Sequence, residues 1–510
     1  MSVVQRAARN WHWILLSVIF WYCGLRCVAP GLLDTGGDSA QYIIIGESLA
    51  QGDGLRMVNY PGKPLSVLAP GISVLLSAIL FFFGRNFWLM QVLILLLSYF
   101  TLVAFYRLFK EDLPHPAAFF LVAFLFLNRL YWGYSHKILT EVPLLFFSGI
   151  SFLTFARYKR MPTVINKEGW LTAAALLLVY FFRYVGVLVF LSVLLSLWME
   201  RKNDDGKAVK KKIIFLTAVF VPVFLVWQLR NASVASPYAP SFAQQFLPLD
   251  GYAPHHGLIT DNPWFLLLRF IEGINFYASN IQEALLPFPI PGAFYNAAVC
   301  ISFYIVWLGL WDRMKRGRRV FVIYFLAYLF LISFWPFYED GRYLFPILPF
   351  VFYFYFFGLT AVFRFFTRSP QKALKALQLA LVAQLICALW FSPRDRYLKL
   401  WSYITDYPPA RNFLAMNAWI ASQVKDKERI ISRKPTVTYL YTGHQSVVYP
   451  FSRDPDVIWQ AVLANNIRYI IVSEAWDNTS VYLKEFLVKY RDRIIPVHRI
   501  GNTELLKIKG

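Results

Sequence analysis

The chain has 510 residues, of which 58% are hydrophobic and 19% aromatic. Several apolar runs are long enough to cross the roughly 30 Å hydrocarbon core of a bilayer, which excludes a soluble protein and predicts a polytopic membrane protein. The net charge of +22 does not indicate nucleic-acid binding, because the Lys and Arg residues fall in short loops between apolar runs, where positive charge orients a membrane protein.

The apolar runs predict about eleven spans. The first is expected to be retained, because no small-residue cleavage site follows its apolar run. Residues 170–199 are divided into two short spans that turn near Arg183, since basic loops flank both ends of this segment. The predicted spans are residues 12–30, 88–108, 116–133, 142–156, 170–182, 185–199, 213–230, 293–311, 320–337, 344–363 and 375–392.

The orientation of the chain depends on the apolar run 65–83. If this run crosses the membrane, Asp38 and Glu141 lie on opposite faces. If it forms a juxtamembrane or shallow helix, every basic cluster falls on one side, which the positive-inside rule assigns to the cytoplasm. We therefore expect the second threading, in the inner or plasma membrane, with a cytoplasmic N-terminus and an extracytoplasmic C-terminus.

The composition changes at about residue 393. We expect residues 1–392 to form a transmembrane domain with outer loops at 31–87 and 231–292, the second of which carries an amphipathic helix. The segment 393–510 is polar, and its alternation of β-branched runs with helical patterns predicts a small extracytoplasmic α/β domain. The expected strands of this domain are 429–432, 469–472, 494–498 and 504–508, and its expected helices are 408–424, 455–465 and 480–490. The amphipathic helix of the second outer loop is expected at 264–286.

The first outer loop contains the stretch DTGGDSAQYIIIGESLAQGDGLRMVNYPGKP at residues 34–64. Such a long connector is more often functional than a plain link. Asp38 precedes a helical pattern that includes Tyr42 and stops at Gly52-Asp53-Gly54. Capping of that helix by the Asp38 carboxylate stays open beside a catalytic role.

The expected threading collects charged residues from several connections on the outer face, where ionisable groups at membrane depth indicate function. Each residue also has a structural explanation: Lys63 and Lys137 reach the interface, Arg183 anchors a hairpin, Asp340 pairs with Arg342, and His136 is a hydrogen-bonded loop residue. The complete set is Asp38, Lys63, His136, Lys137, Glu141, Arg183, Asp340, Arg342 and Tyr343.

Two carboxylates with several fixed cations suit chemistry on a lipid-linked phosphate. Lys and Arg neutralise phosphate, and the Arg fork binds it in a bidentate manner. A carboxylate in a partly dry site accepts a proton from an incoming hydroxyl. Fixed positive charge then stabilises the leaving group.

Four motifs occur in a specific order: GDSAQYIIIGESLAQGDG, YPGKPL, LTEVP and GRYLFPILP. In this order the sequence resembles the polyprenyl-phosphate-sugar-dependent glycosyltransferases of the GT-C superfamily, among them the protein O-mannosyltransferases and the lipid A aminoarabinose transferases. The similarity extends to about residue 392. It implies a GT-C type fold and an inverting transfer of sugar from the lipid to an acceptor hydroxyl outside the cytoplasm.

The resemblance also implies roles for individual residues. An acidic residue that opens a juxtamembrane helix in the first outer loop is the proposed base, and this position is Asp38. The second acidic residue is Glu141, a catalytic residue that orients the acceptor or assists the base. The Lys before Pro that meets the donor phosphate is Lys63, and Arg342 and Tyr343 lie near that phosphate. We add Arg183 from its position, and Tyr42, His136 and Asp340 as supporting residues.

This chain departs from the commonest pattern of the superfamily. Gly-Asp-Ser replaces an Asp-Glu pair at Asp38, and Glu141 replaces an Asp. These differences leave open whether a divalent metal ion is needed. They also leave open whether the acceptor is a glycan, a lipid or a protein. The sequence does not indicate the sugar or the oligomeric state.

We considered two other functions. A transporter or flippase of lipid-linked sugars would carry midplane charge and an inverted repeat, and the sequence has almost none of the first and no sign of the second. An oligosaccharyltransferase would carry a Trp-Trp-Asp signature, which is absent.

Overall fold

The computed structural model describes residues 3–28, 36–201, 206–234, 245–248, 257–262, 264–286, 290–316, 319–339, 341–391, 408–425, 427–475 and 478–509. The chain forms two compact units, and each is described by itself. Unit 1 comprises Met1–Val28, Gln91–Ser233 and Asn262–Leu398, and unit 2 comprises Ala29–Met90, Val234–Asp261 and Lys399–Gly510.

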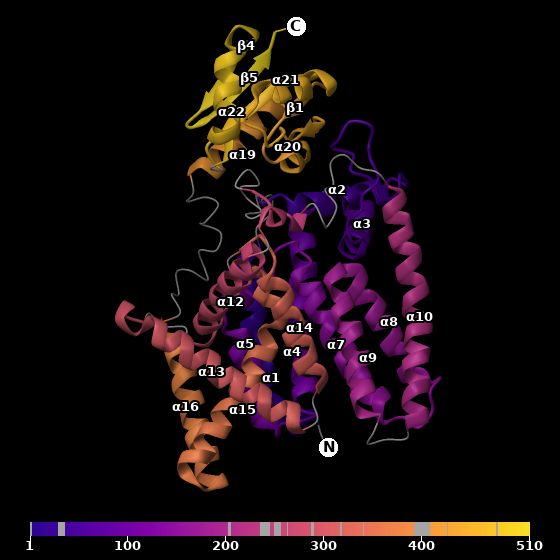
Figure 1. The fold of residues 1–510 in the computed structure, drawn as a ribbon, viewed down its shortest axis with the longest axis vertical. Coiled ribbons are helices and arrows are strands. Elements are labelled where there is room, and N and C mark those ends of the chain that lie inside the picture. Colours follow the sequence, from indigo (N-terminus) through magenta and orange to yellow (C-terminus); the bar gives the residue numbers. More distant parts are fainter. Residues whose placement is uncertain are drawn as a thin grey trace. The chain divides into compact units, whose positions relative to one another are not determined.

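Unit 1 is built from helices (Figure 1). Four helices of the described chain, α4, α10, α13 and η4 with α15, are long and apolar enough to cross a membrane, and shorter apolar helices accompany them. The elements are α1 (Val3–Cys27), α4 (Phe87–Phe109), α5 (His115–Phe126), α6 (Arg129–Tyr134), α7 (Glu141–Arg160), α8 (Lys167–Phe182), η1 (Tyr184–Gly186), α9 (Val187–Glu200), α10 (Gly206–Ser233), α12 (Trp264–Leu285), α13 (Gly292–Arg316), α14 (Arg319–Ser333), η4 (Arg342–Ile347), α15 (Leu348–Thr367) and α16 (Pro370–Phe391).

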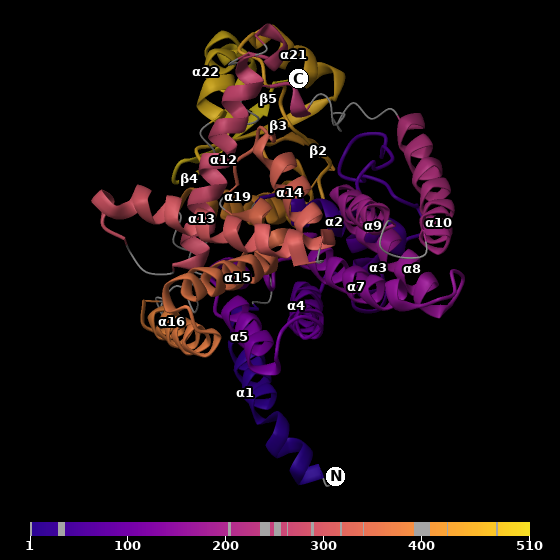
Figure 2. The same cartoon turned by 60° about the horizontal axis from the view of Figure 1, so that its bottom comes forward.

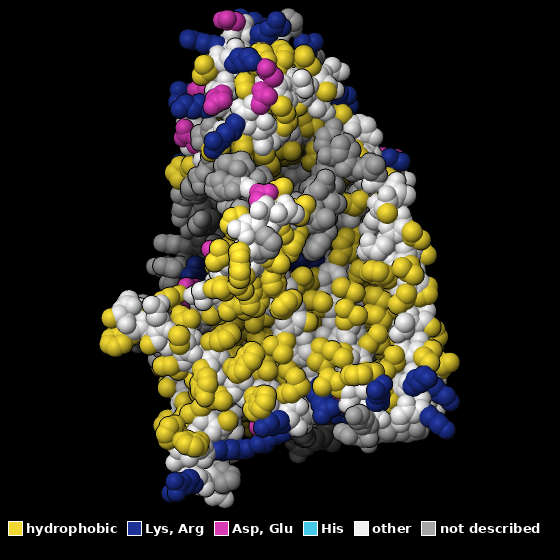
Figure 3. Space-filling model, in the orientation of Figure 1, with side chains coloured by type: hydrophobic (Ala, Val, Ile, Leu, Met, Phe, Trp, Pro, Cys, Tyr) yellow, Lys and Arg dark blue, Asp and Glu magenta, His cyan; other side chains and the backbone are white. Residues whose placement is uncertain are grey.

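Charge is distributed unevenly along these helices. Figure 3 shows hydrophobic side chains over the helical face of unit 1 and Lys and Arg gathered at one edge of it. Basic residues also occupy the last turns of two of these helices: Arg157, Lys159 and Arg160 in α7, and Arg313, Lys315 and Arg316 in α13. An apolar belt bounded by basic residues is typical of a membrane protein.

The prediction of a polytopic helical membrane protein is confirmed, and the number of spans stays a prediction. One expected span, 116–133, is divided into α5 and α6. The break lies at Asn128, whose side chain accepts a hydrogen bond from the Leu130 N–H and donates one to the Ala284 carbonyl at 3.0 Å. An Asn that caps the following helix in this way ends the preceding one, and the apolar pattern alone does not indicate this break.

Helices α13 and α15 lie side by side, as Figures 1 and 2 both show. Glycine permits this close approach: a Cβ atom on Gly309 would lie 1.8 Å from the Phe354 carbonyl oxygen, and one on Gly358 would lie 1.8 Å from the Ile305 carbonyl oxygen. The backbones of the two helices therefore touch, which is how small residues join helices inside a membrane.

We expect Gly309→Ala to destabilise unit 1 by about 3 kcal/mol or more, because the new methyl group meets backbone atoms that cannot move aside. Gly292→Ala is the matched control in the same helix, since nothing lies within 4 Å of a Cβ there. Thermal unfolding of the purified protein, followed by tryptophan fluorescence, measures both variants. Equal unfolding temperatures for the two variants would show that the α13 and α15 backbones do not touch at Gly309.

Unit 2 contains a five-stranded sheet with the strand order β2-β1-β3-β5-β4. Strands β2 and β3 pair parallel to β1, whereas β5 pairs antiparallel to both β3 and β4. The strands are β1 (Arg429–Ile431), β2 (Ser446–Val447), β3 (Ile467–Ser473), β4 (Ile494–Ile500) and β5 (Thr503–Ile508), and the C-terminal helices are α19 (Pro408–Gln423), α20 (Pro435–Thr442), α21 (Pro455–Ala464) and α22 (Asn478–Lys489).

The predicted C-terminal α/β domain is confirmed, with β2 and α20 as additions to it. Strand β2 has only two residues, which is too short for a pattern to indicate. Helix α20 begins with Pro435 and ends at Gly443, which has a φ of +74°. Pro at the start and Gly after the end are the usual limits of a helix.

The first loop of the sequence is part of this C-terminal core. Its helices are α2 (Asp38–Ala50) and α3 (Gly71–Phe83), and its side chains Ile45, Met57 and Tyr60 belong to one buried hydrophobic cluster with Ile431 and Val447 of the sheet. Helix α3 has 13 residues and rises about 20 Å, less than the roughly 30 Å of a hydrocarbon core. Length alone does not decide the threading, since α5 of unit 1 has only 12 residues, and the shallow or juxtamembrane placement of this helix stays a prediction.

An ion pair fixes these two helices to α20. Glu47 of α2 is 9% exposed and accepts hydrogen bonds from Arg85, which follows α3; one of them, from Nη2 to Oε2, measures 3.0 Å. The same guanidinium donates through Nη1 to the Leu440 carbonyl of α20 at 2.7 Å. Three elements are thus held by a single side chain.

Candidate functional site

Glu141 is the centre of a buried ion-pair cluster in unit 1. It is the first residue of α7, ahead of the apolar part of that helix, and its side chain is 0% exposed. Its Oε1 accepts a hydrogen bond from Nη1 of Arg183 at 2.5 Å and another from Nε of Arg342 at 2.6 Å. Arg342 also donates through Nη1 to Oε2 of Glu339 at 2.7 Å. One carboxylate therefore fixes two guanidinium groups that come from distant parts of the chain.

The position of each arginine follows from local structure. Arg183 ends α8 in an extended conformation, with φ −158° and ψ 132°, before η1 begins. Arg342 begins η4 after Gly341, whose φ of +66° is one that glycine adopts readily. Both arginines therefore stand at helix ends, where the chain changes direction.

Burial and charge act in opposite directions on Glu141. Burial alone would raise its pKa, but the positive charges of Arg342 and Arg183 outweigh burial and lower the pKa to about 2. Glu141 is therefore ionised near neutral pH and is a poor proton acceptor. The side chains of Arg183 and Arg342 keep 22% and 12% of their surface exposed, so it is the cations of this cluster, and not its central acid, that a ligand reaches.

Aromatic hydroxyl groups surround the cluster. The Arg183 guanidinium carbon lies 5.5 Å from the centroid of the Tyr343 ring, a cation–π distance. Tyr328 of α14 is 1% exposed and interacts electrostatically with Glu141 and both arginines. The sequence indicated Tyr343 but neither Tyr328 nor Glu339. Glu339 lies three residues before Arg342, and such local spacing is the only signal that could have indicated it.

His136 and its neighbours lie in the connection before α7. His136 is 7% exposed, and burial, followed by the charge of Lys137, lowers its pKa to about 4. It is therefore neutral near pH 7 and is no cation for a phosphate. The Lys137 ammonium lies 5.1 Å from the Tyr134 ring centroid, and Asp340 lies outside the described residues.

Asp38, Tyr42 and Lys63 belong to unit 2. The N-cap of α2 is Gly37, with a φ of +101°, and Asp38 is the first residue of the helix. Its carboxylate is in the first turn, where the helix dipole stabilises negative charge. Asp38 is partly exposed, and Tyr42, four residues later and also partly exposed, lies on the same helix face.

Two side chains of the C-terminal domain hold the backbone just before Asp38. Lys434 donates through Nζ to the Gly36 carbonyl at 2.6 Å, and Thr436 donates through its hydroxyl to the Gly37 carbonyl at 3.2 Å. Both donors lie at or just before the start of α20. No pattern in the sequence connects these two segments, which are about four hundred residues apart.

Lys63 lies at the end of a tight loop that Arg56 closes. Arg56 donates to the carbonyls of Asp53, at 3.0 Å, and Lys63, at 3.1 Å. The Lys63 backbone has a φ of +49°, uncommon for a residue with a side chain. Its ammonium is 3.8 Å from the Asp53 carboxylate and the side chain is 54% exposed, which leaves this cation accessible to a ligand.

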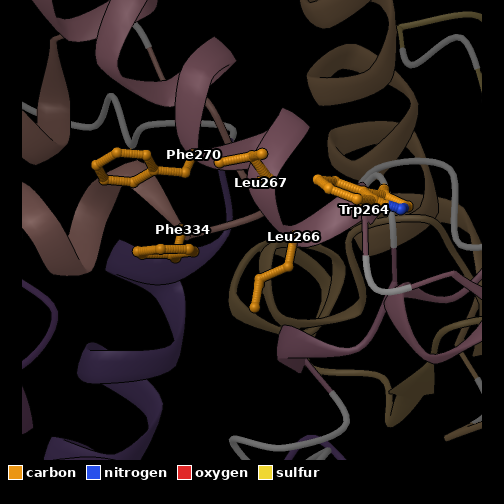
Figure 4. Close-up of a pocket in the computed structure, with 5 residues that line it drawn as sticks. All are labelled: Trp264, Leu266, Leu267, Phe270 and Phe334. Carbon is orange, nitrogen blue, oxygen red and sulfur yellow. The ribbon is translucent and has the colours of Figure 1, made fainter.

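Two further observations bear on ligands. Within the described ranges, no three His, Cys, Asp or Glu side chains are grouped closely enough to hold a metal ion. An apolar hollow of about 390 Å³ lies in unit 1 between the start of α12 and the end of α14 (Figure 4). It is lined by Trp264, Leu266, Leu267, Phe270 and Phe334, so it offers contacts to hydrocarbon but none to charge.

Comparison with known proteins gives a match in structure only. No family model matches this sequence, and no curated protein does either. The structure is similar to that of ArnT, a lipid A aminoarabinose transferase, from Cupriavidus metallidurans bound to undecaprenyl phosphate, with a TM-score of 0.60, 12% identity and 98% of each chain covered.

A second similarity is to the oligosaccharyltransferase AglB from Archaeoglobus fulgidus in complex with an inhibitory peptide and a dolichol-phosphate. The TM-score is 0.55 at 10% identity, and the match covers 96% of this chain and 73% of that one. Both proteins have the GT-C fold. This chain, a helical membrane protein with a small C-terminal sheet domain, therefore has the GT-C fold as well.

Proposed function

We propose that the protein is an integral membrane glycosyltransferase. It transfers a sugar from a polyprenyl-phosphate sugar to an acceptor hydroxyl on the extracytoplasmic side of the inner or plasma membrane, with inversion. The observation that carries this proposal is the pair of partly exposed arginines, Arg183 and Arg342, fixed by one buried carboxylate in a chain with the GT-C fold. Fixed guanidinium groups suit a phosphate that gains negative charge as the sugar leaves.

The remaining residues have roles that follow from their chemistry. Asp38, partly exposed at the start of α2, accepts the proton of the acceptor hydroxyl. Arg183 and Arg342 neutralise the donor phosphate, and Tyr343 donates a hydrogen bond to it. Lys63, whose ammonium is accessible, is a further phosphate-binding cation. Tyr42 supports Asp38. A divalent ion in this site is not required by these roles and is not excluded by them.

Glu141 acts as a positioning residue in this proposal. Its burial and its pKa of about 2 argue against proton transfer and favour the anchoring of both arginines. His136, also buried, supports the connection that precedes α7.

A transfer assay tests the proposal. Purified protein is incubated with a panel of labelled polyprenyl-phosphate sugars and with membrane extracts as the source of acceptor. We expect one donor to lose its sugar to an acceptor. If no donor is consumed but lipid-linked sugar moves across vesicles that contain the protein, the protein is a flippase.

We expect loss of the side chains that hold the Asp38 backbone to slow transfer. Lys434→Met and Thr436→Val remove the hydrogen bonds to Gly36 and Gly37, and a displacement of about 1 Å at a reacting group can cost about 10²-fold in rate. The loss should appear in kcat more than in KM, and Lys434→Arg should recover part of it. Lys427→Met, in the same domain, is the control. If kcat is unchanged in both Lys434→Met and Thr436→Val, these hydrogen bonds do not position Asp38.

A further inference from the structure

The carboxyl edge of the C-terminal sheet has the topology of a ligand site. Strand β1 lies between β2 and β3, and all three are parallel. The chain runs from β1 to β2 on one side and then returns through α21 to β3 on the other side. Such a reversal in strand order opens a crevice at the carboxyl ends of the strands, where α/β proteins bind their ligands. The residues that follow β1 are Ser432, Arg433 and Lys434.

Arg433 projects into an aromatic environment at this edge. Its guanidinium carbon is 4.8 Å from the centroid of the Phe451 ring. Tyr449 and Tyr482 interact electrostatically with the guanidinium, and each of them is 1% exposed. Tyr449 and Phe451 follow β2, and Tyr482 is on α22. The arginine therefore faces segments that follow β2 and β3, the two strands on either side of β1.

Among the residues that the structure describes, this partly buried guanidinium has no carboxylate partner. In the described part of the chain, its Nε is buried and has no hydrogen-bond acceptor, and Arg433 forms none of the ion pairs found there. A buried donor without an acceptor costs about 1–3 kcal/mol. By contrast, Arg468 on β3 of the same sheet has the Glu428 carboxylate 3.9 Å from its Nε, and its side chain is 47% exposed.

We infer that Arg433 is the cation of a second binding site, which takes the anionic group of a small polar ligand at the carboxyl edge of the sheet. The group is a phosphate or a carboxylate, since either matches the planar fork of arginine. The Phe451 ring lies at a cation–π distance from the fork. Burial lowers the pKa of Arg433, as expected of a cation whose counter-charge arrives with the ligand. This inference does not depend on the proposed transfer reaction.

Titration calorimetry on the full-length protein in detergent tests the inference. The probes are inorganic phosphate, glucose 6-phosphate and glucuronate, with glucose as the neutral control. We expect at least one anion to bind and glucose not to bind, and the contrast between the phosphates and glucuronate identifies the anionic group. Arg433→Gln should weaken binding of that anion at least tenfold.

Arg468→Gln is the matched control, because Arg468 is on β3 of the same sheet and should leave the affinity unchanged. If Arg433→Gln does not fold, Arg433→Lys, which keeps the charge and removes the fork, should weaken binding of the same anion. Binding of no anion, or equal binding by the wild type and the Arg433 variant, would overturn the inference.

Discussion

Asp38→Asn is expected to lower the rate of sugar transfer by about 10³-fold, since a positioned general base contributes about 10²–10⁴-fold. The amide has nearly the shape of the carboxylate but cannot accept the acceptor proton. Donor binding should persist, because the proposed phosphate contacts come from Lys63, Arg183 and Arg342. Single-turnover transfer and binding of labelled donor measure these two effects separately.

Asp492→Asn provides the control for this prediction, since Asp492 is an exposed acid in the same unit. It should transfer sugar at the wild-type rate. If Asp38→Asn keeps full activity, Asp38 is not the base. If it loses donor binding and transfer together, Asp38 serves the donor and not the acceptor.

Glu141→Gln is expected to destabilise the protein by about 3–5 kcal/mol, the usual cost of removing one partner from a buried ion pair. The variant leaves the Arg183 guanidinium without its carboxylate, whereas Arg342 keeps Glu339. Thermal unfolding of the detergent-solubilised protein measures the loss. The control is Glu111→Gln, whose partner Arg160 is 60% exposed, and such a surface pair contributes less than about 1 kcal/mol.

The pH dependence of stability gives an independent readout of Glu141. Its pKa in the folded protein, about 2, lies below the ordinary value of 4.5. The stabilisation from its negative charge is therefore fully present above about pH 4.5 and is lost as the pH falls toward 2. Between pH 5 and 8, the plot of transfer rate against pH should therefore contain no step caused by ionisation of Glu141. If the wild type shows such a step and Glu141→Gln abolishes it, Glu141 takes part in proton transfer.

Coupling between the paired residues is also expected. Adding Arg183→Met to Glu141→Gln should restore part of the lost stability, because the unpaired guanidinium is removed. A double variant whose loss equals the sum of the two single losses would show that the pair does not interact in solution.

Hydrophobic patterning predicted most of the helices. Runs such as 88–108 and 293–311 correspond to α4 (Phe87–Phe109) and α13 (Gly292–Arg316), because a membrane helix needs a continuous apolar length that the sequence displays directly. The break at Asn128 was missed because it depends on a bond to the Ala284 carbonyl, which is a contact between distant segments.

The first loop shows a second limit of sequence analysis. Its charges indicated function, but nothing in it indicated that Met57 and Tyr60 enter the core of the C-terminal sheet. Single apolar residues in a loop have no periodicity. The partners that bury them, such as Val447, follow almost four hundred residues later.

Charge placement predicted part of the candidate site. The basic loops placed Glu141, Arg183 and Arg342 on one face of the membrane, and these three side chains are bonded in unit 1. Which acid pairs with which arginine could not be predicted. Among the described residues, Arg342 pairs with Glu141 and Glu339. The alternative pairing of Arg342 with Asp340 stays a prediction, because Asp340 lies outside the described residues.

The most direct test of the account is an experimental structure of the protein in a lipid nanodisc with polyprenyl phosphate bound. We expect the phosphate oxygens to lie within hydrogen-bond distance of Arg183 or Arg342. A resolved phosphate that contacts neither arginine would contradict the proposed site.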